Sequence, residues 1–163
     1  MKTTAILAAV LFLSACATPY QDISTDVRGG FYTERISENH FAVSFSGNGF
    51  TAPRRARDLC ILRAAELTLE YNYSFFTIDG QRNLSRVSQI DMGSTTTTNG
   101  FVSPYGGFSA TSTTSDTQIP VFKPGTRLFI TCYDSIPSDP HLGRIFDARQ
   151  VAADLRAKYG IKN

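Results

Sequence analysis

Three cysteines are the side chains of this 163-residue chain with the clearest chemistry. Cys16 follows directly on an unbroken apolar run over residues 5–13 and two small residues. A thiolate is the nucleophilic form of cysteine, and it can accept a diacylglyceryl group. Cys60 and Cys132 lie far downstream, each among apolar neighbours. The first cysteine is therefore a candidate for covalent modification, and the other two are candidates for a bond with each other.

The first fifteen residues predict a signal peptide. Lys2 supplies the positive charge, and the apolar run is far shorter than the roughly 20 residues that a membrane-spanning helix needs. Residues 13–16 (Leu, Ser, Ala, Cys) resemble the lipobox of bacterial lipoproteins. The resemblance implies removal of residues 1–15 and anchoring in a lipid bilayer through acylated Cys16. The alternative is an ordinary signal peptide with an incidental cysteine. Ala17, where an Asp would favour retention on the inner membrane, implies the outer membrane facing the periplasm.

The remaining two cysteines predict a disulfide. Cys60 shares a helical stripe with Ala64, and Cys132 shares a strand face with Ile130, so both are expected to face the core. An oxidising compartment favours a bond between such a pair. Two buried free thiols that pack as small hydrophobic groups are the alternative.

Other groups offer little chemistry. His40 and His141 have no Cys, Asp or Glu at metal-ligand spacing, so neither a metal nor another cofactor is expected. Arg63 and Glu66 are spaced i,i+3, which predicts either a structural salt bridge or a polar pair that lines a groove. The net charge is only +2 and no basic patch stands out, which argues against nucleic acid as a partner. No residue pattern indicates an enzyme.

The pattern of the chain predicts three regions: the signal peptide, a lipidated tether over residues 16–28, and a single domain over residues 29–163. In that domain a β-hairpin is expected first, then a helix from Pro53 to about Tyr71 with Thr51 as its cap and Asn72 as a left-handed stop. A last helix is expected from about Asp147 to Tyr159, ended by Gly160. The expected strands cover residues 31–36, 40–46, 74–79, 82–91, 119–122 and 127–133.

Residues 94–117 are rich in Ser, Thr and Gly and nearly free of charge. Threonine favours two arms of a long exposed hairpin, whereas glycine favours a disordered loop. The aromatic residues between 101 and 108 are expected either to contact a glycan or partner protein or to fold onto the loop itself. The expected fold class is α+β, a mostly antiparallel sheet with one long helix packed on a face and a C-terminal helix.

Several stretches resemble a family of small proteobacterial lipoproteins of the Caulobacter type. The resemblance implies an envelope location but no activity, and its most recognisable part is the Arg-Ala-Ala-Glu-Leu stretch at residues 63–67. The expected function is a non-enzymatic module that binds an envelope protein or peptidoglycan. A structural or envelope-stress scaffold is the alternative, followed by an enzyme acting on peptidoglycan or lipid. The similar stretches are residues 29–31, 35–36, 41–48, 62–68 and 74–78.

Overall fold

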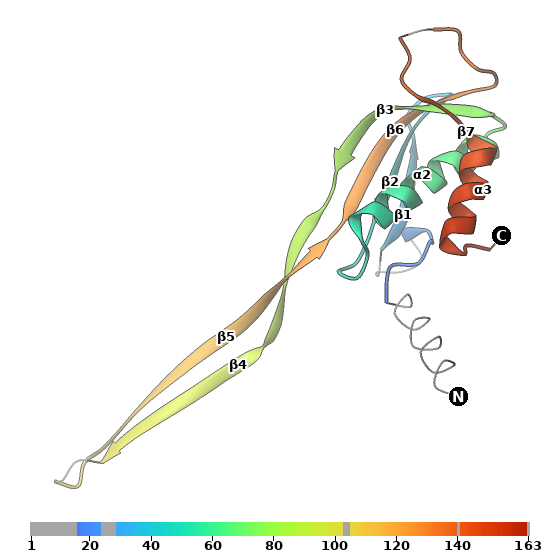
Figure 1. The fold of residues 1–163 in the computed structure, drawn as a ribbon. Helices are drawn as coiled ribbons and strands as arrows, with labels where there is room; N and C mark the ends of the chain where they lie inside the picture. Colours follow the sequence, from blue (N-terminus) through green and yellow to red (C-terminus); the bar gives the residue numbers. More distant parts are fainter. Residues whose placement is uncertain (1–15, 24–28, 103–104, 140, 163) are drawn as a thin grey trace, which may run out of the picture. The chain divides into compact units, whose positions relative to one another are not determined.

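The computed structural model describes residues 16–23, 29–102, 105–139 and 141–162 (Figure 1). The predicted signal peptide, residues 1–15, lies outside these ranges. The chain divides into two compact units, the first made of residues 1–86 and 122–163, and the second of Val87–Val121. No helix among the described residues is both long and apolar enough to cross a membrane.

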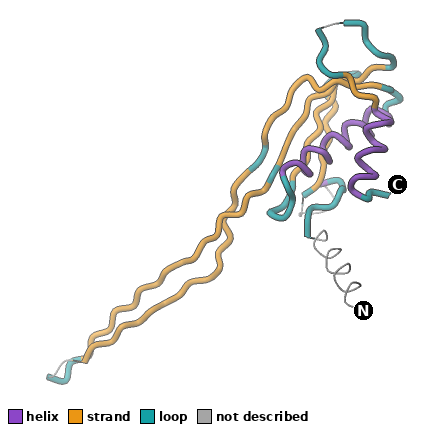
Figure 2. Tube along the Cα trace, in the orientation of Figure 1, coloured by secondary structure: helices purple, strands orange, loops and turns teal. Residues whose placement is uncertain are grey.

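The first unit is built on a five-stranded antiparallel sheet with the strand order β1-β2-β6-β3-β7. The second unit is the two-stranded sheet of β4 and β5, and the strands and helices are easily told apart in Figure 2. The element bounds are β1 Gly30–Arg35, β2 His40–Ser46, α2 Pro53–Glu70, β3 Phe75–Asn83, β4 Arg86–Val102, β5 Phe108–Lys123, β6 Gly125–Tyr133, β7 Ile145–Asp147 and α3 Ala148–Tyr159.

The core of the first unit is shared by this sheet and the two helices. In β2 the alternating pattern buries Phe41 and Val43 completely, and Val43 lies opposite Leu128 of β6. Leu59 and Leu62 of α2 are also fully buried in the same cluster. Burial of each large apolar side chain contributes about 1.5–3 kcal/mol, so this cluster is the main source of the unit's stability.

The helix ends follow local rules with one exception. Asn72 has a φ of 65°, which confirms the predicted left-handed stop after α2. Asp147 accepts a hydrogen bond from the backbone N–H of Gln150, and Gly160 is left-handed, which confirms both predicted ends of α3. The predicted cap of α2 is wrong: Ala52 is the capping residue and Thr51 makes no capping bond.

The predicted fold class, α+β with one long helix on a sheet face, is wrong as stated. The chain is mostly β, with 49% of its residues in strands and 22% in helices, and its strands form two separate antiparallel sheets. The difference arises mainly at residues 94–117. The sequence left open whether this segment is a loop or a hairpin, and in the structure it forms most of two long strands. These strands are rich in threonine and lack the alternation of apolar and polar residues from which a strand is usually predicted.

Candidate functional site

Residues 16–23 of the tether predicted over residues 16–28 lie against the folded unit, and residues 24–28 lie outside the described residues. Thr18 is fully buried, and its N–H donates to Thr51 Oγ1 at 3.0 Å while its hydroxyl accepts from Asn48 N at 2.8 Å. The Asn48 side-chain amide donates to the carbonyl oxygen of Cys16 at 2.8 Å. Thr51 is therefore occupied with Thr18 instead of capping α2. The predicted acylation residue is exposed, yet its carbonyl is held by Asn48 in the turn between β2 and α2.

That turn is itself tightly closed. Asn48 Oδ1 accepts hydrogen bonds from Phe50 N and from Thr51 Oγ1, both at 3.0 Å. A Cβ atom on Gly47 would stand 2.7 Å from Thr51 Cβ, so only glycine allows Thr51 to approach this closely. Phe50 is 75% exposed, and its N–H binds the same Asn48 side chain that binds the Cys16 carbonyl.

Tyr20 attaches the same segment to both helices. Its hydroxyl donates to Glu66 Oε2, and Glu66 Oε1 accepts from Nε and Nη2 of Arg156 at 2.9 and 2.7 Å. Burial, and then the hydrogen bond to the Glu66 carboxylate, raise the pKa of Tyr20 well above its usual range. The Arg63–Glu66 pair is a loose one at 3.8 Å, because the Arg63 fork binds Glu70 at 2.5 and 2.9 Å instead.

The end of the segment borders the edge strand β1. The Tyr20 and Phe31 rings lie 4.9 Å apart, and the N–H of Phe31 donates to the carbonyl of Gln21 at 2.8 Å. Asp22 forms a parallel bridge with Phe31. The segment therefore covers part of the edge of β1 through contacts of Tyr20, Gln21 and Asp22 with Phe31.

The predicted Cys60–Cys132 disulfide is not formed, and both thiols are free and buried. The Cys60 thiol donates to the carbonyl of Val43 at 3.2 Å, whereas Cys132 Sγ lies 3.4 Å from the hydroxyl of Thr68. Thr68 is eight residues beyond Cys60 on α2, which places it, with Cys132 beside it, about 12 Å along the helix from Cys60. A disulfide needs Cα atoms within about 7 Å. Burial raises the pKa of Cys60 to about 12, so its thiol is unreactive.

The second unit is a hairpin without a core of its own. Residues 89–101 and 105–120 are exposed, and Asp91 and Asp116 are the only charged residues in Val87–Val121. Hydroxyl groups meet across the strands, at 2.9 Å between Thr96 and Thr114. The exposed aromatic side chains of this unit gather around its turn: Phe101, Tyr105 and Phe108.

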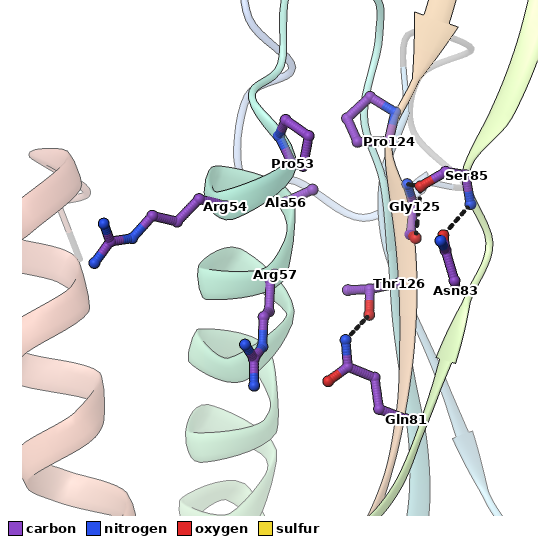
Figure 3. Close-up of a pocket in the computed structure, with 10 residues that line it drawn as sticks. All are labelled: Pro53, Arg54, Ala56, Arg57, Gln81, Asn83, Ser85, Pro124, Gly125 and Thr126. Carbon is purple, nitrogen blue, oxygen red and sulfur yellow. Dashed lines mark hydrogen bonds between the residues drawn. The ribbon is translucent and has the colours of Figure 1, made fainter.

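An open cleft of about 540 Å³ lies between the start of α2 and the strands β3 and β6 (Figure 3). Gln81 Nε2 donates to Thr126 Oγ1 at 3.4 Å, and Asn83 Oδ1 accepts from Ser85 N at 2.8 Å, so its amides already have partners. Its lining contains arginine side chains but no thiol, imidazole or carboxylate. The cleft therefore offers groups that hold water or an anion and none that transfers a proton.

The two histidines lie apart from this cleft. His40 Nδ1 is 2.9 Å from the hydroxyl of Ser37, and both His40 and His141 are exposed. Within the described ranges, no three His, Cys, Asp or Glu side chains gather so that they could hold a metal ion.

Comparison of the chain with models of protein families, with curated proteins and with solved structures finds no match. The resemblance to small proteobacterial lipoproteins thus stays a prediction. The docking of residues 16–23 was missed from the sequence because contacts that hold it, such as Thr18 with Thr51 and Tyr20 with Glu66, join positions more than 30 residues apart.

Proposed function

We propose that this chain is an exported lipoprotein, anchored by acylated Cys16 to the periplasmic face of the outer membrane, whose β4–β5 hairpin is a non-enzymatic binding arm for another envelope protein. The lipobox pattern of residues 13–16 supports the anchor, and so does the exposure of Cys16 at the surface of the folded unit. A thioether-linked lipid on an exposed sulfur displaces no core residue. Several acyl chains together make release from the bilayer negligible.

The observation that carries the binding role is the hairpin with two open edges. A two-stranded sheet is marginally stable alone in water, and each outer strand presents unpaired N–H and C=O groups. Proteins usually protect such edges with charged side chains or proline. Residues 92–102 of β4 and 108–115 of β5 contain neither. The edges are therefore suited to pairing with an added strand.

The side chains of the hairpin favour a protein partner recognised through its main chain. Both faces of its central part carry Ser and Thr, so no apolar face is available for a packed interface. Main-chain hydrogen bonds supply affinity in strand addition, and hydroxyl groups tolerate many side chains of the added strand. The aromatic residues Phe101, Tyr105 and Phe108 provide an apolar anchor at the turn.

A test places a photo-crosslinking amino acid at Thr97 or Tyr105 and identifies the products in intact envelopes. The matched variants carry Thr95→Lys with Thr111→Lys, which charge the edges, or Thr95→Val with Thr111→Val, which keep them neutral. We expect one protein product that is lost with lysine and retained with valine. Crosslinks that survive the lysine variant, or none at all, would contradict the binding arm. Mass spectrometry of the mature protein, with Cys16→Ser as its control, tests the anchor.

A further inference from the structure

We infer that the surface around the acylation residue lies directly on the lipid headgroups, with Phe50 inserted into the bilayer interface beside the acyl chains. This surface, here called the anchor face, consists of Cys16, Asn48, Phe50, Arg86 and Lys123. The inference rests on the proposed acylation of Cys16 and adds to it a specific orientation of the folded unit on the membrane.

No free linker separates the lipid on Cys16 from the fold. The carbonyl of Cys16 is already bonded to Asn48, and Thr18, two residues later, is fully buried. Two residues of extended chain span at most about 7 Å. A lipid on Cys16 therefore brings the folded unit into contact with the headgroup layer, since there is no length of chain to hold it away.

Phe50 is linked through Asn48 to the acylation residue. It is two residues from Asn48, whose side chain binds both the Cys16 carbonyl and the Phe50 N–H. One amide side chain thus couples the lipid attachment point to the aromatic residue. Scattered exposed apolar side chains are normal on protein surfaces. Phe50 is 75% exposed and is linked through Asn48 to the lipidated residue, so its ring can contact the acyl region of the bilayer.

Positively charged side chains line this end of the unit. Arg86 and Lys123 line the hollow that Gly47 and Asn48 form at this end of the unit, and no acidic residue lines it. Arg54 and Arg57 line the cleft between α2 and the strands β3 and β6, and no acidic residue lines that cleft either. Ile23 also lines the hollow, and the residue before it in the sequence, Asp22, is acidic but is not among the lining residues. Clustered cations next to an acyl anchor favour phospholipids with anionic headgroups.

The experiment uses the absence of tryptophan from the chain. Phe50→Trp introduces a single reporter into the acylated mature protein, which is then reconstituted into phosphatidylcholine vesicles with or without phosphatidylglycerol. Ile136→Trp is the matched control, because Ile136 is also exposed and follows β6 at the end of the sheet where Asn39 contacts Cys132. Asn48 follows β2 at the other end of the same sheet.

We expect the tryptophan emission of the Phe50→Trp variant to shift to shorter wavelength and to be quenched by brominated lipid, more strongly with phosphatidylglycerol present. The reporter of the Ile136→Trp variant should remain accessible to iodide. Equal iodide access of the two reporters, with the acyl mass present on Cys16, would overturn the anchor face and leave the lipoprotein proposal intact. Absence of the acyl mass would overturn both. Shielding of the Phe50→Trp reporter in detergent-free protein without vesicles would show that a second copy covers this face, which also overturns the inference.

Discussion

Replacing Glu66 with glutamine tests how the N-terminal segment is held. The Glu66 side chain is 11% exposed and binds Tyr20 through one oxygen and Arg156 through the other. Glutamine keeps the shape but removes the negative charge and replaces one accepting oxygen with a donating NH2 group, so the bonds from Tyr20 and Arg156 lose their charge assistance and one of these partners loses its acceptor. Glu70→Gln is the matched control on the same helix, because Glu70 also pairs with an arginine but is 51% exposed.

The expected magnitudes differ because the two carboxylates differ in burial. Hydrogen bonds to a charged group contribute about 1.5–3 kcal/mol, and neutral ones about 1 kcal/mol. Glu66→Gln weakens two such contacts, and the partial exposure of Arg156 reduces the effect, so the free energy of unfolding should fall by about 2 kcal/mol. Glu70→Gln should cost about 0.5 kcal/mol, as exposed pairs do.

Urea unfolding of both variants, followed by circular dichroism, measures these free energies. Amide hydrogen exchange then locates the change: Glu66→Gln should speed exchange at Thr18 and at Phe31, whose N–H groups hold the segment on the unit. If Glu66→Gln costs no more than Glu70→Gln, or if exchange at Thr18 is unchanged, the Tyr20–Glu66–Arg156 contacts do not hold the segment and the reasoning is refuted.

Three further predictions concern the same unit and the hairpin. Stability should be full below about pH 9 and fall as the pH rises, because the raised pKa values of Tyr20 and Cys60 keep both groups protonated in the folded chain while they ionise in the unfolded one. Alkaline urea titrations should show a shallower fall above about pH 10 for Tyr20→Phe. Thr51→Val should leave the buried N–H of Thr18 without an acceptor and cost about 1–3 kcal/mol, whereas Thr51→Ser should cost less; equal losses by thermal unfolding would contradict this bond. Replacing residues 91–119 with Asn-Gly should change the free energy of unfolding of the first unit by less than about 1 kcal/mol, because the hairpin is a separate unit. A larger loss in denaturant titration would show that the hairpin supports that unit.

Elements with a strong local pattern were predicted from the sequence. The alternation over residues 40–46 predicted β2 with its observed bounds, and Asn72, Asp147 and Gly160 predicted three helix ends. Each signal acts within a few residues, through side-chain alternation, a capping bond or a left-handed φ. The three-residue strand β7 carries too few residues for such a pattern and was missed.

The hairpin β4–β5 could not be decided from residues 94–117, because threonine and glycine have opposite preferences for strands. The cysteine pair shows a second limit. Both thiols face the core as their patterns predicted, but the pairing of α2 with β6 places Cys132 at Thr68, two helical turns from Cys60. Facing inward is a local property, whereas distance within the core depends on how two elements slide along each other.

The sequence alone determined the features that act over short stretches of chain: the apolar run before Cys16, the lipobox pattern and the ends of the helices. Only the tertiary structure decided that the residues after Cys16 are docked. That docking depends on Thr18 meeting Thr51, Tyr20 meeting Glu66, and Glu66 meeting Arg156, across 33, 46 and 90 residues of sequence. Such contacts require the whole first unit to fold, because no local preference of either partner specifies the other.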